Sequence, residues 1–272
     1  MGKDIKGIPV LQDERLIRLI ADIHKVKSSQ KVCFIIGAGA SISSGIRSGE
    51  RLSTEWLKEI KECILDEVDY KTWVTEKKIN EDYPGENYSD IYIQRFEDSK
   101  EIGYDFINHE MQGKEPNIGY LLLGELLNYK EQNIVIATNF DNLIERSLYT
   151  YQSVEPLVCA HENMAVYARP ADGRPLIAKI HRDKLFDPIN DPDGVNNLDK
   201  NWIEPLIELF SDKIVVCIGY GGNDGSLMKL LNQINPPKGL YWCILPNATP
   251  PKKVSMLKLL GLMSLFLNCG VK

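Results

Sequence analysis

Short apolar runs alternate with longer segments in which apolar residues recur every three or four positions. Strands are expected at Val32–Ile36, Asn133–Ala137, Leu176–Ile180, Lys213–Gly219 and Leu240–Leu245, with a weaker candidate at Met263–Leu267. Helical patterns cover residues 11–29, 52–65, 117–129, 139–150, 201–211, 224–234 and 251–260. Continuous apolar strands are typical of parallel sheets buried on both faces. The alternation predicts an α/β fold, a Rossmann-like parallel sheet with helices on both faces.

Residues 66–115 have a different character. Polar and aromatic residues mix there, the sequence YPGEN at 83–87 predicts a turn, and no strong strand pattern occurs. We therefore expect a small, mostly helical module inserted into the sheet domain. The sheet domain would then consist of residues 1–65 and 116–272.

The first expected strand ends at Gly37-Ala38-Gly39, and helix-forming sequence follows within a few residues. Glycines let the backbone turn tightly and approach a ligand, and the next helix would direct free N–H groups toward an anion such as a phosphate. The full dinucleotide fingerprint would need a glycine where this chain has Ile42. Two interpretations remain, a nucleotide-binding loop or a structural strand-to-helix turn.

Three other strand ends also carry polar or glycine-rich sequence. Thr138-Asn139-Phe140-Asp141-Asn142 suits a helix cap or a binding site, and His181-Arg182-Asp183 includes a histidine that is either structural or placed for proton transfer. The segment from Gly219 to Ser226 is a second glycine loop before a helix. Ligands of such sheets bind beyond the carboxyl ends of the strands, so we expect all these segments to surround one site.

Composition narrows the function classes. The chain has 272 residues, 43% of them hydrophobic, and a net charge of −6, which argues against a general nucleic-acid-binding protein. No apolar run is long enough to predict a membrane span. Six scattered cysteines form no C-x-x-C pair, as expected of structural cysteines in a reducing cytoplasm, and show no zinc spacing.

Several segments together resemble the sirtuin-type NAD-binding fold. These are GAGASISSGI (37–46), PNIGYLLLGELL (116–127), TNFDNLIE (138–145), KIH (179–181) and VCIGYGGND (216–224). The likeness is greatest to sirtuin-like effector domains of bacterial anti-phage defence proteins, which hydrolyse NAD⁺. It spans residues 31 to about 246.

The resemblance implies roles for individual residues. Gly37, Ala38, Gly39 and Ser41 would line the pyrophosphate. Asn139 and Asp141, with Thr138 beside them, match the family's Asn-x-Asp, which holds the nicotinamide ribose, its water and the carboxamide. His181 matches the catalytic histidine. Gly219, Tyr220 and Asn223 would approach NAD from the later strands.

The chain also departs from the protein-deacylating sirtuins. Those have Pro-Asp-Phe-Arg after the first loop, where this chain has Arg47-Ser48-Gly49-Glu50. Arg182 replaces the family's glycine after the histidine, and Tyr120 replaces a usual histidine. The four zinc-binding cysteines of deacylases are missing from residues 182–216. The expected substrate is therefore NAD, with no zinc and with water as the acceptor.

The resulting hypothesis is an NAD⁺ glycohydrolase that works as a regulated effector. As a homo-oligomer or with a partner ATPase, helicase or sensor, it would be kept inactive until triggered; no membrane or direct nucleic-acid contact is expected. The alternatives are a zinc-free deacylase or ADP-ribosyltransferase, and a non-catalytic module that senses NAD or ADP-ribose. A dehydrogenase is disfavoured, because no acidic residue clearly ends a second strand about 20 residues after the glycine loop.

Overall fold

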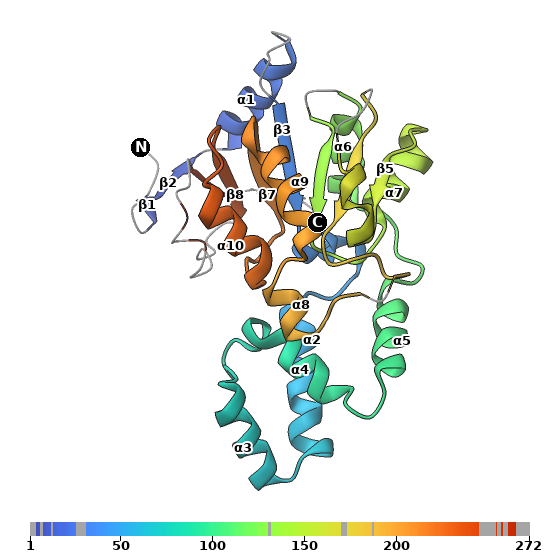
Figure 1. Cartoon of the computed structure of the whole chain (residues 1–272), viewed down its shortest axis with the longest axis vertical. Helices are drawn as coiled ribbons and strands as arrows, with labels where there is room; N and C mark the ends of the chain where they lie inside the picture. Colours follow the sequence, from blue (N-terminus) through green and yellow to red (C-terminus); the bar gives the residue numbers. More distant parts are fainter. Residues whose placement is uncertain are drawn as a thin grey trace, which may run out of the picture.

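The computed structural model of the chain describes residues 4–5, 8–11, 13–25, 31–129, 132–169, 173–186, 188–244, 254, 257 and 261–264. Within these residues a sheet lies above a group of helices in the view of Figure 1. The helical group lies beyond the carboxyl ends of the parallel strands.

The sheet has the order β1-β2-β9-β8-β7-β3-β4-β6-β5. Its strands are β1 (Asp4–Ile5), β2 (Ile8–Leu11), β3 (Lys31–Ile36), β4 (Ile134–Ala137), β5 (Leu157–Cys159), β6 (Leu176–Lys179), β7 (Lys213–Ile218), β8 (Leu240–Ile244) and β9 (Gly261–Ser264). All neighbouring pairs are parallel except β1 and β2. The predicted α/β fold with a parallel sheet is confirmed.

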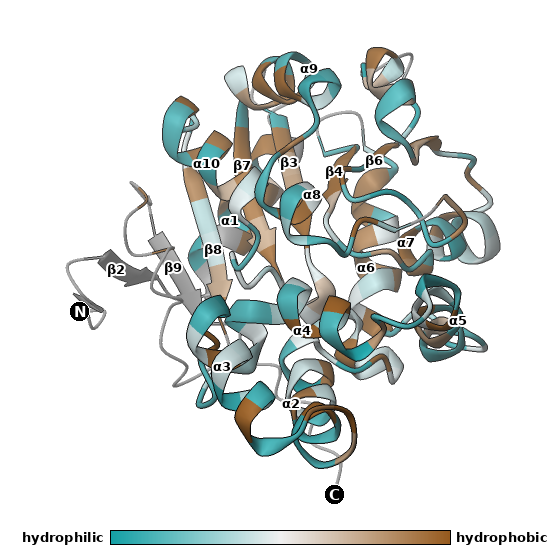
Figure 2. Ribbon diagram, turned by 60° about the horizontal axis from the view of Figure 1, so that its bottom comes forward, coloured by the Kyte–Doolittle hydropathy of each residue, from teal (hydrophilic) through white to brown (hydrophobic). Residues whose placement is uncertain are grey.

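Helices cover both faces of the sheet, and β3, β4, β6 and β7 between them are largely brown, that is apolar, in Figure 2. Val32, Phe34 and Ile36 of β3 pack on one face with α1 (Asp13–Lys25), α6 (Ile118–Leu127) and α7 (Leu143–Arg146). Cys33 and Ile35 face the other side, where α9 (Lys200–Ser211) and α10 (Gly225–Ile234) lie. This alternation follows from the two-residue period of a strand.

The helical group comprises α2 (Gly49–Glu59), the π-helix η2 (Ile60–Ile64), α3 (Glu67–Lys77), the 3-10 helix η3 (Pro84–Asn87), α4 (Tyr88–Arg95) and α5 (Lys100–Met111). Its centre is Trp56 of α2, whose ring lies 5.5 Å from those of Tyr88, Phe96 and Phe106. Residues 66–115 contain α3, η3, α4 and α5. Because α2 packs on α4 and η3, its contacts argue for grouping it with them, and the division into 1–65, 66–115 and 116–272 stays a prediction.

Several local expectations need correction. The helix expected at 139–150 begins only at Leu143, because residues 138–142 form a loop, and it continues as the π-helix η4 (Ser147–Gln152). The helix expected over residues 52–65 changes to a π-helix at Ile60, and Ile64 at its end is 40% exposed. The expected helix at 251–260 and strand residues 265–267 lie largely outside the described residues.

Elements that the apolar pattern did not indicate are short. They are β1, β2, β5, the 3-10 helices η1 (Ala38–Ser44) and η5 (Glu162–Tyr167), and α8 (Pro192–Asn196). None of the described helices combines the length and the apolar character that spanning a bilayer requires.

Candidate active site

A cavity of about 380 Å³ opens at the carboxyl ends of β3, β4, β6 and β7. One wall comes from the loops that follow these strands, and the other comes from α2, η3, α4 and α5. Of the predicted site residues, the cavity is lined by Ala38, Gly39, Thr138, Asn139, Asp141, His181, Gly219, Tyr220 and Asn223. Gly37 and Ser41 are not among its lining residues, but both form hydrogen bonds to segments that line it.

The two glycine loops interlock through their backbones. The amide of Gly39 donates to the carbonyl of Gly219 at 2.8 Å, and the amide of Gly37 donates to Ile218 O at 3.1 Å. A Cβ on Gly39 would lie 2.7 Å from Gly219 O, and Gly219 itself has φ +63°. These glycines therefore permit loop-to-loop packing, and the amides of Gly37 and Gly39 are already used within the protein.

Ser41 links the first loop to the Asn-x-Asp segment. Its hydroxyl donates to Asp141 Oδ2 at 2.7 Å, so it accepts from the Tyr120 hydroxyl at 2.8 Å, since a hydroxyl has one hydrogen to give. Asn139 Nδ2 donates to the same Asp141 oxygen at 2.6 Å. Burial, with the nearby Asp141 charge, raises the pKa of Tyr120 above its usual range, which keeps the phenol a donor.

Asn117 explains why Tyr120 reaches this network. Asn117 caps α6, its side-chain oxygen accepting from the amide of Gly119, and its Nδ2 donates to Ala40 O at 2.8 Å. The cap thereby fixes the start of α6 against η1, one turn before Tyr120. The side chain of Tyr120 is thus fixed at the site.

A buried lysine holds the other side of the Asn-x-Asp loop. Lys179 Nζ donates to Asp141 O at 2.6 Å, lies 2.9 Å from Glu145 Oε1, and forms an ion pair with Asp183. Burial alone would lower the pKa of Lys179, but Glu145 and Asp183 raise it, so the cation persists. Since Lys179 ends β6, it ties the loop after β4 to the strand that precedes His181.

His181 lies on the cavity wall and is 4% exposed. Among the described residues neither of its ring nitrogens has a hydrogen-bond partner, and Asn139 Oδ1 is likewise buried and unpartnered. Buried polar atoms are normally satisfied, so such atoms on a cavity wall indicate groups that a ligand would satisfy. The next residue, Arg182, adopts φ +66°, in the left-handed region that favours glycine.

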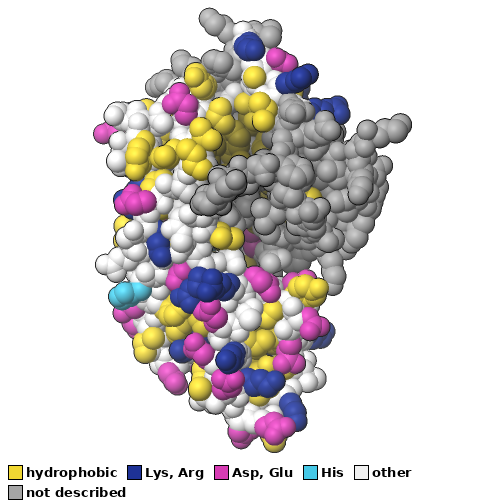
Figure 3. Space-filling model, turned by 180° about the vertical axis from the view of Figure 1, so that it is seen from behind, with side chains coloured by type: hydrophobic (Ala, Val, Ile, Leu, Met, Phe, Trp, Pro, Cys, Tyr) yellow, Lys and Arg dark blue, Asp and Glu magenta, His cyan; other side chains and the backbone are white. Residues whose placement is uncertain are grey.

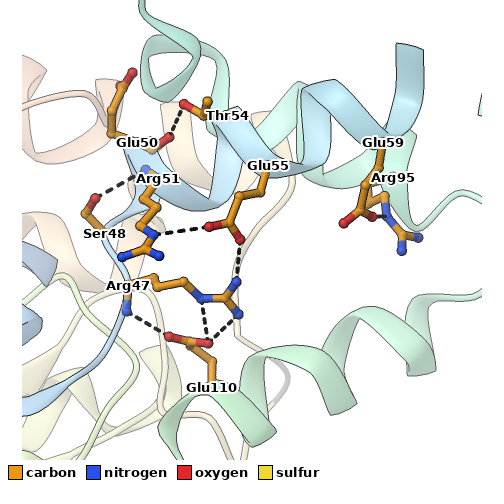
Figure 4. Close-up of polar contacts among 9 residues, drawn as sticks. All are labelled: Arg47, Ser48, Glu50, Arg51, Thr54, Glu55, Glu59, Arg95 and Glu110. Atoms are coloured by element: carbon orange, nitrogen blue, oxygen red, sulfur yellow. Dashed lines mark hydrogen bonds and ion pairs between the residues drawn. The ribbon is translucent and has the colours of Figure 1, made fainter. Parts of the chain in front are cut away.

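The wall opposite the strand ends is held by polar contacts. Arg47 donates to Glu110 of α5 through Nε at 2.9 Å and through its backbone amide at 2.8 Å, and it also pairs with Glu55 of α2 (Figure 4). Glu50 accepts from the amide of Gly85 at 2.8 Å. The segment Arg47-Ser48-Gly49-Glu50, where deacylases have Pro-Asp-Phe-Arg, therefore connects α2, α5 and η3.

Sequence reasoning missed three contributors to this site: Asp224, Glu110 and the interactions of Arg47. Asp224 follows β7 and His181 follows β6, and two other strands lie between them in the sheet. The available signal was an acidic residue in the second glycine loop. Among the described residues, no group of three or more His, Cys, Asp or Glu side chains could hold a metal ion.

Comparison with known proteins finds similar sequences. Residues 133–259 match the family model of the SIR2-like domain. Defense-associated sirtuin 2 of Bacillus subtilis is 24% identical over 244 residues, which cover 86% of this chain. Residues 133–259 are thus similar to a SIR2-like domain, and most of the chain is similar to part of a defence-associated sirtuin. The chain spans 22% of the length of that relative.

Solved Sir2 structures are also similar. A mutant Sir2 homologue in complex with 2′-O-acetyl ADP ribose has 14% identity and a TM-score of 0.49, over 93% of this chain and 90% of that one. A Sir2 homologue in complex with NAD has 14% identity and a TM-score of 0.44, over 93% and 90% of the two chains. Sir2 bound to an acetylated peptide has 12% identity and a TM-score of 0.44, over 93% and 92%.

Proposed function

We propose that this chain hydrolyses NAD⁺ at the bond between nicotinamide and ribose, releasing nicotinamide and ADP-ribose. The observation that carries the proposal is the meeting of His181, Asn139 and Asp141 around one cavity at the carboxyl ends of the parallel strands. The SIR2-like match, which includes all three residues, supports NAD as the substrate.

Cleavage of the bond between nicotinamide and ribose does not require a strong general acid from the protein. Nicotinamide leaves as a neutral molecule, and positive charge develops on the ribose as in glycoside hydrolysis. Water then forms the new bond to the sugar carbon, and its proton must be taken up. His181, with two unpartnered ring nitrogens, is placed to accept that proton, a contribution commonly worth about 10²–10⁴ in rate.

Asn139 would orient the water or a ribose hydroxyl, and Asp141 would stabilise the positive charge that develops on the ribose. The free Oδ1 of Asn139 can accept a hydrogen bond from water or from a ribose hydroxyl. Asp141 accepts from Ser41 and Asn139 through Oδ2, and from the amide of Leu143 through Oδ1 at 3.1 Å. A carboxylate fixed by these donors is a preorganised negative charge, which favours a developing cation.

The biological setting is part of the proposal. The similarity to Defense-associated sirtuin 2 supports an NAD-depleting effector in anti-phage defence. Such an activity must be restrained in an uninfected cell, so we propose that it is controlled through homo-oligomer assembly or through a partner ATPase, helicase or sensor. We further propose that it acts in the cytoplasm without zinc.

Chromatographic measurement of nicotinamide released from NAD⁺ tests the activity. Asn139→Ala and His181→Ala should reduce release at least about 100-fold, because each removes a group needed for the chemical step. His109→Ala is the matched control: His109 lies exposed on α5, where its Nδ1 contacts Asp105 O, and its replacement should leave release unchanged.

Circular dichroism spectra identical to wild type would show that both site variants are folded. Undiminished release from both would refute the assignment. Release that requires an added acylated peptide would instead identify the zinc-free deacylase or transferase. Tight binding of NAD⁺ without turnover in any assembly state would identify a sensing module.

A further inference from the structure

We infer that Asp224 is a positioning residue that fixes the orientation and the tautomer of His181. The inference rests on the proposed function of His181 as a proton acceptor. It concerns a residue outside the Gly-Ala-Gly, Asn-x-Asp and histidine set, contributed by the second glycine loop.

The carboxylate of Asp224 is anchored at both oxygens. Oδ1 caps α10, accepting from the amide of Leu227 at 2.9 Å and from the Ser226 hydroxyl at 3.2 Å. Oδ2 accepts from the Tyr220 hydroxyl at 2.7 Å and lies 3.7 Å from Nε2 of His181. Because its other contacts hold the carboxylate in place, Oδ2 presents a fixed acceptor to the imidazole.

The pair is almost fully buried, with side-chain exposures of 9% for Asp224 and 5% for His181. Burial would raise the pKa of Asp224, but His181, the Tyr220 hydroxyl and the amide of Leu227 together lower it below its usual range. Asp224 is therefore ionised near neutral pH. An ionised carboxylate only accepts hydrogen bonds.

The ionised state determines which ring nitrogen carries the proton. Nε2 lies 3.7 Å from this acceptor, beyond hydrogen-bond distance but near enough for the charge of Asp224 to favour a proton on Nε2. We therefore expect the neutral ring to be the Nε2–H tautomer. Nδ1 is then the lone-pair nitrogen, and among the described residues it has no partner. We expect Nδ1 to be the atom that takes the proton from water. A buried carboxylate supports a histidine base in the same manner in the Ser-His-Asp triad.

Capping alone does not account for an aspartate at this position. Asparagine caps a helix as well as aspartate does, and only Oδ1 is used for capping α10. A buried charge is costly unless it is paired. The negative charge directed at His181 is the property that asparagine would lack, which makes Asp224→Asn a specific test.

The first readout needs no substrate. NMR of the protein labelled with ¹⁵N-histidine reports the tautomer of each ring, and His181→Gln identifies the His181 signals. At a pH where the ring is neutral, we expect wild type to show the Nε2–H form and Asp224→Asn to lose this preference. Ser226→Ala, which removes only a contact to Oδ1, should keep it. An Nδ1–H form in wild type would overturn the inference without any variant.

The second readout is kinetic. In Asp224→Asn we expect kcat for NAD⁺ cleavage to fall at least about 10-fold while KM stays within about twofold, because the base is misoriented and the binding groups remain. A kcat equal to that of wild type would overturn the inference. If wild type releases no nicotinamide, the proposed function fails, and the tautomer of His181 still decides what Asp224 does.

Discussion

Gly219 shows how a single backbone conformation determines the shape of the site. Its φ of +63° is in the left-handed region, and a Cβ on it would lie 2.1 Å from the backbone nitrogen of Ala40. The same residue accepts the hydrogen bond from Gly39 that joins the loops after β3 and β7. Both the conformation and the close approach require glycine.

Replacing Gly219 by alanine should therefore cost more than a left-handed conformation alone. We expect Gly219→Ala to lower the free energy of unfolding by about 2–4 kcal/mol, because overpacking typically adds about 1–3 kcal/mol to the conformational cost. Gly113→Ala is the matched control: Gly113 has φ +69°, and no described atom lies within 4 Å of its Cβ position. It should lose only about 1 kcal/mol. Equal losses in urea denaturation would contradict the argument.

At this scale the sequence identified the residues that carry recognisable chemistry. Asn139, Asp141 and His181 follow apolar strands, so their meeting at one sheet edge could be predicted. The residues that hold these three side chains in place could not be predicted from the sequence. Tyr120 reaches Ser41 across 79 positions, and Asp224 approaches His181 across two intervening strands, and neither contact leaves a local pattern.

Among the elements, α5 is joined to the segment before α2 by one arginine, in addition to the packing of Phe106 on Trp56. Arg47, 29% exposed, donates to Glu110 of α5, which is 11% exposed, and its guanidinium lies 5.4 Å from the ring centroid of Phe106 on the same helix. Ion pairs shielded from water are worth more than exposed ones. The Arg47–Glu110 pair should therefore contribute measurably to stability.

A double-mutant cycle with Arg47→Met and Glu110→Gln should give a coupling free energy of about 1–2 kcal/mol. The control cycle uses Lys71→Met and Glu67→Gln, an (i, i+4) pair whose side chains are 71% and 81% exposed. That pair should give only about 0.3–0.5 kcal/mol. Similar coupling in both cycles, measured by chemical denaturation, would show that burial adds nothing to the Arg47 contact.

The Arg47–Glu110 pair should also respond to pH. Burial would raise the pKa of Glu110, but its hydrogen bonds and charge interaction with Arg47 hold it below the usual glutamate value of about 4.3. A carboxyl with a depressed folded-state pKa stabilises the fold above its unfolded pKa and loses that contribution as pH falls through the folded value. The gap in Tm between wild type and Glu110→Gln should therefore be full at pH 7 and narrow below about pH 4. A constant gap would contradict this.

The elements of the sheet were predictable in proportion to their burial and length. β3 and β7 are six-residue apolar strands with neighbours on both sides, so their apolar runs are continuous. β5 has three residues at the edge of the sheet, too few for any period to be visible. The expected start of α7 was wrong because Asn139 and Asp141, typical capping residues, lie in the site loop, four and two positions before Leu143.

At the scale of the whole molecule, the cavity lies between two differently built parts. The loops after the strands contribute Asn139, Asp141 and His181. The helical group contributes Glu50, Tyr88 and Glu110 to the opposite wall, together with Arg47 just before α2. In the rear view, basic and acidic side chains are interspersed over the lower, helical part (Figure 3). The two walls meet at Gly85, which donates to Glu50 and accepts from Asn223 at 3.3 Å. A change in how the helical group packs would therefore alter the site directly.

Regulation by assembly makes a prediction for the intact chain. If assembly changes the packing of the wall against the strand ends, nicotinamide release per chain should rise with protein concentration, in step with a shift to larger species in size-exclusion chromatography. His181→Ala should assemble in the same way without turnover, which separates assembly from catalysis. A constant release per chain across the whole range, with an unchanging elution volume, would exclude control by self-association. It would leave a partner protein as the source of regulation, because unrestrained hydrolysis would exhaust a pool that every cell needs.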